Sequence, residues 1–403
     1  MAMERKIKVY SEIGNLKTVL LHRPGAEIEN LIPEHLARLL FDDIPFLRVA
    51  RTEHDNFSKV LSDNGVEVLY IENLAAQAVK DKETRESFLD EVIAESEIKD
   101  ENIAGTLKNY LRALPEKEMI DNIIAGIRNK EIGLSEDNNE YPFIMEPMPN
   151  LYFTRDPFAS IGRGITLNSM KNHIRHRETI FAKYVFKYHQ EFKNSDIPLW
   201  YNRNEKFSIE GGDELIFSDE VIAIGNSERT STEAIMRTAK NIFEARETFK
   251  TVLMFNIPKS RAFMHLDTVF TMIDYDKFTV HQGIEGNLQV SAITYDYKNK
   301  ALKVTHEEDS LERILSKYLN RDITLIRCGG GDRVIGRREQ WNDGSNTLAI
   351  SPGKVITYER NYITNEILDK HNVKVISIPS GELSRGRGGP RCMSQPLFRE
   401  DIK

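Results

Sequence analysis

An internal repeat constrains the fold of this chain more than any other feature of the sequence. Two segments, beginning at Gly211 and Gly330, share one order of motifs: GGD, an apolar strand, Glu-Arg, a Ser/Thr-x-Glu helix start, a helix, and a strand ending in Ile-Pro. The second copy is longer because it carries the turn-rich run REQWNDGSN. Each copy is a ββαβ unit, and repetition of such units predicts a ring-like α/β arrangement around a central site.

The N-terminal region fits part of a further unit, and a region of different character follows it. Thr18–His22 and Val66–Ile71 are apolar, β-branched runs that predict strands on either side of a helix. From about Leu74 to Gly133 the chain is charged and keeps helical spacing of its apolar residues. We therefore expect one catalytic domain over residues 1–403, with an all-helical insertion at about 74–140.

Composition narrows the possible partners and location. The chain is 40% hydrophobic and 29% charged, with a formal net charge of −7, which argues against a nucleic-acid or anionic-membrane surface. Its beginning lacks the apolar core of a signal peptide, and no apolar stretch approaches a membrane span, so we expect a cytoplasmic protein. The two cysteines are expected to be reduced thiols, and the absence of CxxC or HExxH spacing indicates metal-free chemistry.

One of these cysteines, Cys392, lies near the C-terminus in the run GRGGPRCMSQPL. Arg385, Arg387 and Arg391 flank it, and several glycines surround it. A cationic, flexible loop is a setting that lowers the pKa of a thiol and exposes a nucleophilic thiolate. From this loop alone, a cysteine without a role is an equally good interpretation.

Three polar clusters lie elsewhere, in the runs MPNLYFTRDPF, SIEGGDE and FMHLDTVFTM. They contain Asn150, Phe153, Asp156, Glu210, His265 and Asp267. If HLD is part of a strand, His265 and Asp267 project from the same face. Each cluster alone fits a turn or a satisfied core residue as well as a functional role. Several carboxylates beside a thiol suit a planar cation such as guanidinium, whose charge would favour the thiolate.

The motifs FTRDPF, EGGD, HLDT and GGPRCMS, in this order and spacing, resemble those of the bacterial arginine deiminases of the guanidino-group-modifying superfamily. The resemblance runs from Ser11–Gly25 to the C-terminus and includes the helical insertion. It implies a pentein-like, five-bladed α/β propeller of ββαβ modules. It also implies hydrolysis of free L-arginine to L-citrulline and ammonia through a covalent amidino-cysteine intermediate, the first step of arginine catabolism by the arginine deiminase pathway. No cofactor or metal is implied, and family members commonly assemble as homodimers or homotetramers.

The resemblance assigns a role to each residue of the reaction centre. Cys392 would be the nucleophile that attacks the guanidinium carbon, while Asp156 and Asp267 would clamp the guanidinium nitrogens. His265 would protonate the departing ammonia and then activate the water that hydrolyses the intermediate. Glu210 would orient His265 and stabilise its charge.

The resemblance also places the contacts for the rest of the substrate. They fall on Asn150, Phe153, Arg175, Arg229, Gly386 and Arg387. Without the family, Arg175 and Arg229 would be read as surface arginines; with it, they supply cations for the α-carboxylate of arginine. Gln395 stands where many relatives have methionine, which bears on the packing of the loop. Cys328 is interpreted as a thiol at a strand end without a catalytic role.

Three alternative functions stay open at this point. An amidinotransferase shares the covalent intermediate but passes the amidino group to an amine, and an agmatine deiminase acts on a substrate without a carboxylate. The arginines at the expected carboxylate contacts favour free L-arginine over agmatine. A non-catalytic arginine-binding protein would not need Cys392, His265 and both aspartates together.

Overall fold

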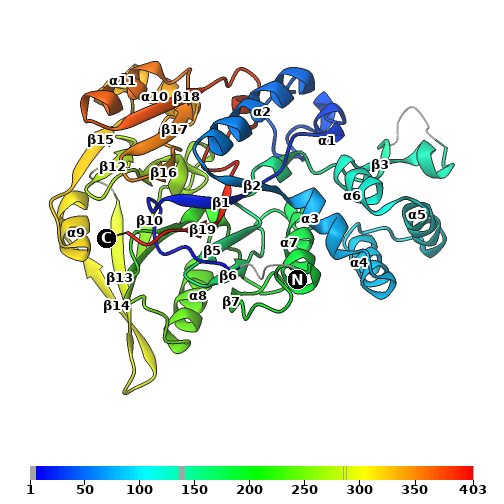
Figure 1. The fold of residues 1–403 in the computed structure, drawn as a ribbon, viewed down its shortest axis with the longest axis horizontal. Helices are drawn as coiled ribbons and strands as arrows, with labels where there is room; N and C mark the ends of the chain where they lie inside the picture. Colours follow the sequence, from blue (N-terminus) through cyan, green and yellow to red (C-terminus); the bar gives the residue numbers. More distant parts are fainter. Residues whose placement is uncertain (1–5, 136–140, 285, 287, 403) are drawn as a thin grey trace.

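The computed structural model describes residues 6–135, 141–284, 286 and 288–402. Most of its strands form five modules of one construction: an antiparallel strand pair, a helix, and a third strand parallel to the second. The first module along the chain contains β5 (Phe158–Ile161), β6 (Gly164–Leu167), α7 (Glu178–Tyr188) and β7 (Leu199–Tyr201). The repeated construction confirms the predicted α/β fold of ββαβ modules, drawn in Figure 1.

The next three modules follow in chain order. The second contains β8 (Glu214–Ile216), β9 (Val221–Asn226), α8 (Thr232–Glu244) and β10 (Thr251–Asn256), and β13 (Gln289–Asp296) and β14 (Ala301–Glu307) extend its sheet. The third contains β11 (Phe270–Met272), β12 (Lys277–Val280), α9 (Leu311–Leu319) and β15 (Thr324–Arg327). The fourth contains β16 (Leu348–Ser351), β17 (Lys354–Tyr358), α11 (Tyr362–Lys370) and β18 (Lys374–Ile378).

The fifth module is assembled from both ends of the chain. The C-terminal strand β19 (Gln395–Arg399) pairs antiparallel with β1 (Leu16–Leu21), and β1 runs parallel to β2 (Glu67–Tyr70) after α2 (Leu47–Asp63). In Figure 1, the blue β1 and the red β19 lie side by side. The pairing places the segment just before β19, which carries Cys392, in the interior of the protein.

The modules form because their helices are amphipathic and their strands are apolar. In α8, the side chains of Ile235, Ala239, Ile242 and Phe243 recur at helical spacing and are buried. Ser231 caps the helix by accepting a hydrogen bond from the Ala234 N–H at 3.3 Å. These side chains pack in one core cluster with residues of β9 and β10.

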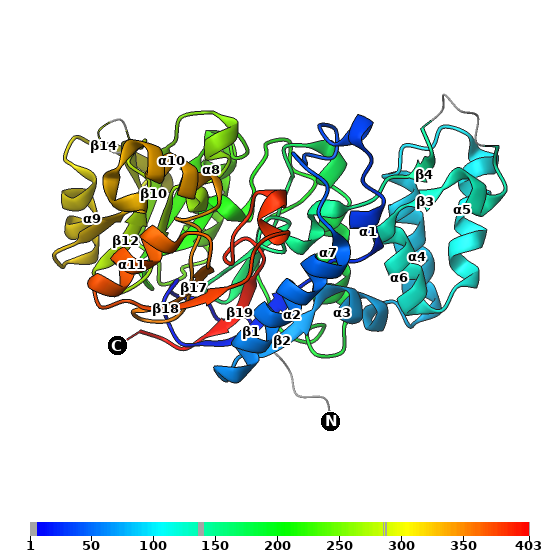
Figure 2. The ribbon, with the colours of Figure 1, turned by 90° about the horizontal axis from the view of Figure 1, so that it is seen from above.

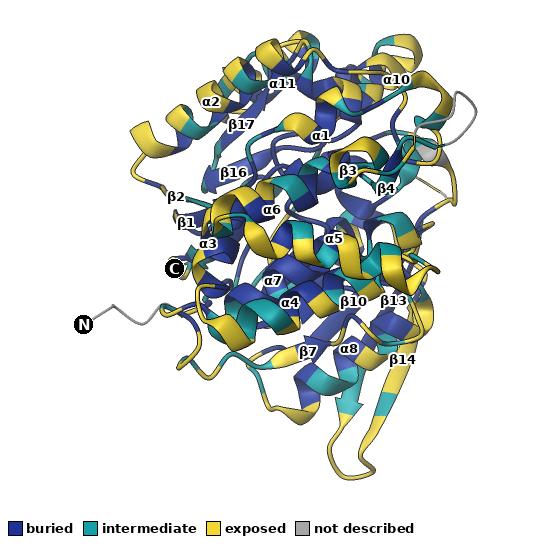
Figure 3. Cartoon of the chain, turned by 90° about the vertical axis from the view of Figure 1, so that its right-hand side faces the viewer, coloured by how far each residue is buried: buried dark blue, intermediate teal, exposed yellow. Residues whose placement is uncertain are grey.

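Four helices between β2 and β5 extend from one end of the molecule (Figure 2). They are α3 (Ile71–Ala78), α4 (Lys82–Ala94), α5 (Glu101–Ala113) and α6 (Glu116–Ala125), followed by the short strands β3 (Ile127–Arg128) and β4 (Phe143–Met145). Asp81 and Asp100 cap α4 and α5, whose outward faces are exposed (Figure 3). We propose that these helices are the insertion predicted over 74–140, although residues 136–140 of that range lie outside the described residues.

The second GGD motif differs from the prediction. After η8 (Cys328–Gly331), Asp332 begins a helix, α10 (Arg333–Trp341), so part of the run REQWNDGSN is helical rather than a turn. The Asp332 carboxylate accepts hydrogen bonds from the Val334 and Ile335 N–H groups, each at 2.8 Å, which explains why the helix begins there. Strand β16 then begins the fourth module.

Within the described residues, no helix has both the length and the apolar character needed to cross a membrane. Other short helices are α1 (Ala26–Glu29), η1 (Pro33–His35), η2 (Asn129–Ile132) and η6 (Arg261–Phe263). The remaining 3-10 turns carry site residues and are described with the site.

A buried histidine joins the first strand to the insertion. His22, just after β1, lies 2.9 Å from Glu72 of α3 through Nδ1 and 3.3 Å from Glu27 of α1 through Nε2. Burial by itself lowers the pKa of His22, but Glu72 and Glu27 outweigh it and raise the pKa from 6.5 to about 10. The imidazolium ion therefore stabilises the folded protein together with two buried carboxylates.

This arrangement predicts an alkaline loss of stability. Because the pKa of His22 is higher in the folded protein, its stabilising contribution is complete below pH 6.5 and is lost as the pH rises towards about 10. Chemical denaturation across this range should show the free energy of unfolding of the wild type falling more steeply than that of His22→Gln. The exposed His371→Gln serves as the control, and equal slopes for all three proteins would contradict the prediction.

Candidate active site

Short 3-10 turns, rather than regular strands, contain or directly flank most of the predicted site residues. Asn150 lies in η3 (Pro149–Tyr152) and Arg175 in η4 (His173–Arg175), and Glu210 precedes η5 (Gly211–Asp213). Asp267 lies in η7 (Leu266–Thr268) and Gly386 in η9 (Leu383–Gly386). The turns bring together side chains from distant parts of the sequence.

The geometry around His265 differs from the sequence expectation. His265 and Asp267 were expected on one face of a strand, but His265 is the extended residue before η7 and β11 begins only at Phe270. The turn is held by Asp213, whose carboxylate accepts a hydrogen bond from the Leu266 N–H at 2.8 Å. The expectation was wrong because this capture by a carboxylate distant in sequence favours a turn over a strand.

The loop that carries Cys392 is fixed from several sides. The Arg155 N–H donates to the Cys392 carbonyl oxygen at 3.1 Å, and the Tyr358 hydroxyl donates to the Gly388 carbonyl oxygen at 2.8 Å. Gly388 packs so closely against the ring of Phe153 that a Cβ atom there would overlap it. Only glycine at this position lets the loop approach the ring.

The thiol of Cys392 lies in a buried environment rich in carboxylates, whereas an exposed, cationic one was predicted. Cys392 is 3% exposed, and its Sγ lies 3.6 Å from Oδ2 of Asp267. Burial, followed by the charges of Asp267, Asp156 and Asp343, raises the pKa of the thiol well above its ordinary value. The expected lowering by a cationic loop is therefore wrong for the ligand-free protein.

The three loop arginines do not face the thiol as free cations. Arg385 forms an ion pair with Asp43 at the surface. The guanidinium carbon of Arg387 lies 3.4 Å from the ring centroid of Trp341, in a cation–π contact. Arg391 is buried and binds two carboxylates, so its charge is already compensated.

Asp267 is held through one of its two carboxylate oxygens. Nη1 of Arg391 donates to Oδ2 of Asp267 at 2.8 Å, while Nε and Nη2 of Arg391 each donate to Glu12 at 3.1 Å. The other oxygen of Asp267, Oδ1, is buried and has no hydrogen-bond partner among the described residues. It is an acceptor available to a ligand.

Asp156 repeats this arrangement. Nη1 of Arg175 donates to Oδ2 of Asp156 at 2.8 Å, and Glu178 binds the other side of the same guanidinium at 2.9–3.1 Å. Oδ1 of Asp156 is buried and, within the described part of the chain, accepts no hydrogen bond. Each aspartate is thus anchored by a buried arginine and keeps one oxygen for a second cation.

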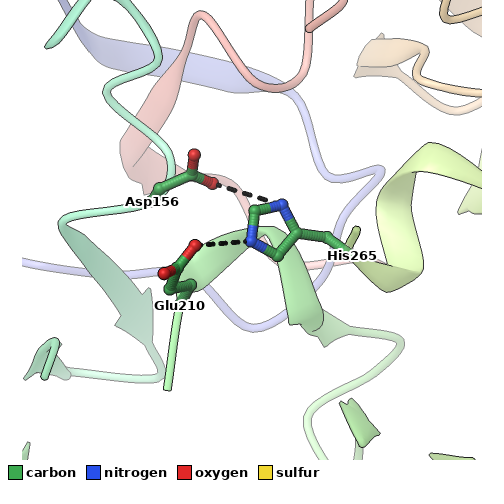
Figure 4. Close-up of side chains that lie close together, drawn as sticks. All are labelled: Asp156, Glu210 and His265. Carbon is green, nitrogen blue, oxygen red and sulfur yellow. Dashed lines mark hydrogen bonds and ion pairs between the residues drawn. The ribbon is translucent and has the colours of Figure 1, made fainter. Parts of the chain in front are cut away.

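His265 lies between two carboxylates (Figure 4). Its Nε2 is 2.7 Å from Oε2 of Glu210, and its Nδ1 is 3.8 Å from Oδ1 of Asp156. Burial by itself lowers the pKa of His265, but Asp156 and Glu210 outweigh it and raise the pKa to about 9. Burial favours a neutral Glu210, yet Arg229 and His265 lower its pKa to about 2. At neutral pH the pair is imidazolium and carboxylate.

The same three side chains have the spacing of a metal site. Asp156, Glu210 and His265 each offer a ligand atom, and these atoms lie within 4.8 Å of one another. Arg175 and Arg229 contact the same carboxylates, with Arg229 Nη1 at 3.4 Å from Glu210 Oε2. Two fixed cations beside the carboxylates disfavour a divalent ion. The cluster suits proton transfer better than metal binding.

Nearly all of the predicted residues line one small cavity of about 30 Å³. They are Cys392, His265, Asp156, Asn150, Phe153, Arg175, Arg229, Gly386 and Arg387. Glu210 and Asp267 are not part of the lining, but they contact His265 and Cys392, respectively. Leu40, Met264 and Thr268 also line it and were not predicted. Their side chains are chemically ordinary, so no sequence signal marked them.

Two buried carboxylates that organise the site were also missed. Glu178 binds Arg175 and Glu12 binds Arg391. The spacing of Arg175 and Glu178, three residues apart at the start of a helix, was a signal for an ion pair. The pairing of Glu12 with Arg391 is distant in sequence and left no local signal.

Comparisons with known proteins agree with this geometry. The family model described as arginine deiminase matches residues 37–399. The chain is 57% identical to an arginine deiminase of Clostridium perfringens, over 99% of each chain. It is 54% identical to one of Staphylococcus haemolyticus, over 98% of this chain and 99% of the relative.

Solved structures share the fold at low sequence identity. An amidinotransferase of Microseira wollei matches with a TM-score of 0.58 and 14% identity, over 98% of both chains. The N-terminal domain of a cyanobacterial arginine dihydrolase matches with a TM-score of 0.54 and 12% identity, over 96% of this chain and 99% of that domain. These two show the fold alone, whereas the family model and the full-length relatives show that this chain belongs to the arginine deiminase family.

Proposed function

We propose that the protein hydrolyses free L-arginine to L-citrulline and ammonia, with Cys392 as the nucleophile. The observation that carries the proposal is that the thiol lies 3.6 Å from Asp267 and lines one cavity with Asp156. Each of these aspartates keeps one buried oxygen that has no hydrogen-bond partner among the described residues. Guanidinium is the cation whose planar donors match two such carboxylates. Family membership supports arginine as the molecule that carries it.

Arginine would create the nucleophile by binding. The thiol of Cys392 is neutral in the ligand-free protein because burial and the surrounding carboxylates raise its pKa. A guanidinium bound by Asp156 and Asp267 would neutralise these charges and favour loss of the thiol proton to solvent. The thiolate would then attack the guanidinium carbon and form a C–S bond.

His265 would transfer protons in both halves of the reaction. In the first half, the imidazolium would donate its proton to the departing nitrogen, so that ammonia leaves and an amidino-cysteine cation remains. In the second half, neutral His265 would take a proton from water as the oxygen attacks the same carbon. Collapse would break the C–S bond, regenerate the thiolate and release citrulline, with the remaining proton taken by ammonia. Glu210 would keep His265 oriented throughout.

The rest of the substrate would be held by the other lining residues. We propose Asn150, Arg175, Arg229 and Arg387 for the α-carboxylate and amino group, with Phe153 and Gly386 along the aliphatic chain. The present cavity, about 30 Å³, has room for about one water molecule. Binding of arginine would therefore require part of the lining to move.

The other enzyme classes differ in what they require of the site. An amidinotransferase would release the amidino group to an amine rather than to water, and an agmatine deiminase would not need cations for a carboxylate. Two arginines in the cavity beyond the one that anchors Asp156 favour a substrate that carries a carboxylate. We also propose that the protein acts in the cytoplasm as a homodimer or homotetramer, as its family resemblance implies.

Replacement of the nucleophile tests the covalent mechanism. Cys392→Ala should abolish citrulline formation and leave the unfolding temperature nearly unchanged, because Asp267, which accepts the hydrogen bond from the thiol, is also held by Arg391. Mass spectrometry of wild-type enzyme quenched with arginine should show an amidino adduct on Cys392. Cys328→Ala is the matched control, since burial raises the pKa of that thiol to about 11 and it lies outside the cavity. Turnover by Cys392→Ala would refute the mechanism.

Removal of one cation tests the assignment of the carboxylate contact. In a Cys392→Ala background, Arg229→Ala should weaken arginine binding about 10- to 100-fold, the range expected for a lost charged hydrogen bond. Agmatine, which has no carboxylate, should lose much less. Calorimetry with both ligands separates this effect from the loss of the Arg229–Glu210 contact, which affects both equally. Equal losses would mean that the contact is misassigned.

The charge of Glu210 should be visible in the pH profile. Glu210 helps to raise the pKa of His265 to about 9, so Glu210→Gln should lower that pKa. With saturating arginine, the alkaline fall of kcat should move down by about 1–3 pH units, the range for loss of a nearby opposite charge. Glu339→Gln, at a buried carboxylate that caps α11, is the control. If the alkaline fall of kcat occurred at the same pH in Glu210→Gln as in the wild type, this role of Glu210 would be excluded.

A further inference from the structure

The side-chain amide of Asn346 connects the loop that carries Cys392 to the turn that carries Asp267. Oδ1 of Asn346 accepts a hydrogen bond from the Cys392 N–H at 3.0 Å, and Nδ2 of Asn346 donates to the Asp267 carbonyl oxygen at 3.1 Å. Asn346 is completely buried and lies outside the cavity lining. Both ends of its amide are bonded to the backbones of Cys392 and Asp267, the proposed nucleophile and one proposed guanidinium clamp.

The chemistry of the two partners determines how this amide is oriented. The Cys392 N–H is a donor and the Asp267 carbonyl is an acceptor, so each end of the amide has one correct partner. A flipped amide would place donor against donor and acceptor against acceptor. Among residues of this size, asparagine thus supplies both an acceptor for the Cys392 N–H and a donor for the Asp267 carbonyl without adding a charge.

The turn that carries Asn346 is itself firmly held. The carbonyl oxygen of Ser345, the preceding residue, accepts hydrogen bonds from the hydroxyls of Thr271 in β11 and Thr279 in β12, at 2.8 and 3.1 Å. On the other side, Gly389 of the Cys392 loop packs against Asn346, where a Cβ atom would lie only 2.7–2.9 Å from its atoms. Asn346 therefore has a fixed position in the fold, and the loop that carries Cys392 packs against it.

We propose that Asn346 is a positioning residue that sets the distance between the thiol of Cys392 and the carboxylate of Asp267, which is 3.6 Å between Sγ and Oδ2. The inference rests on the proposed function, because this distance places sulfur against a guanidinium carbon held by Asp267. A displacement of about 1 Å in such a geometry lowers the rate about 100-fold. The loss should therefore appear mainly in kcat rather than in KM.

Two substitutions test the role in complementary ways. Asn346→Ala removes both hydrogen bonds and leaves space beneath Gly389. Asn346→Asp keeps the shape and the acceptor for the Cys392 N–H, but its ionised form cannot donate to the Asp267 carbonyl. Asn241→Asp is the matched control, because Asn241 also donates from Nδ2 to a carbonyl, that of Trp200 at 2.7 Å, outside the cavity.

The expected result is a fall in kcat of about 100-fold for both variants, with KM changed by less than about threefold. In Asn346→Asp, acidification should raise the ratio of variant to wild-type kcat, because a protonated carboxyl can donate where the amide did. A merely structural role would lower stability without this pH-dependent rescue. A flat ratio across pH, or a kcat near that of the wild type in both variants, would overturn the proposal.

A second readout needs no turnover and so separates this inference from the proposed function. Alkylation of Cys392 by iodoacetamide should require a higher pH in Asn346→Asp than in the wild type, since the added negative charge further raises the pKa of the thiol. Asn241→Asp should leave the alkylation profile unchanged. If the wild type forms no citrulline but this shift is seen, the proposed function fails while the position of Asn346 at the thiol stands. If the pH dependence of alkylation were identical in all three proteins, residue 346 would not influence the Cys392 thiol, and the proposal would be overturned.

Discussion

The site depends on the burial of carboxylates beside one another, close to a thiol that is also buried. An isolated ionised carboxylate in a protein interior is strongly destabilising, and Asp156, Asp267 and Glu210 each have a buried cationic partner. The pairs are Asp156 with Arg175, Asp267 with Arg391, and Glu210 with Arg229 and His265. The other oxygen of Asp156 and of Asp267 has no hydrogen-bond partner among the described residues, and we propose that it binds a cationic substrate.

The same negative surroundings control the nucleophile. They raise the pKa of Cys392 and keep the thiol protonated until a positive charge is close to it. At neutral pH, a molecule without a cation, even one small enough to enter, would leave the thiol of Cys392 protonated. In the proposed mechanism, the charge of the bound substrate therefore both favours its binding and lowers the pKa of the Cys392 thiol.

Much of the fold and most of the site could be predicted from the sequence. The repeated ββαβ order indicated the modules, and the polar motifs contained several of the residues that line the cavity. Arg175 and Arg229, in contrast, were assigned only from the family resemblance. The predictions were wrong where side chains distant in sequence determine the local backbone conformation or the pKa of a site residue. The strand expected at His265 is a turn because Asp213 captures the Leu266 N–H, and the loop arginines do not lower the pKa of Cys392 overall because burial and the carboxylates of Asp267, Asp156 and Asp343 outweigh them. Such pairings are set by tertiary packing and leave no local pattern.

The pairing of β1 with β19 has a consequence for how the protein is made. On the ribosome, β1 is synthesised long before its partner β19, so β1 has one unpaired edge until β19 follows. The segment with Cys392 precedes β19 directly and reaches its place only when that strand docks. A chain shortened to end before β19 would therefore lack both the strand that docks this segment and the antiparallel partner of β1.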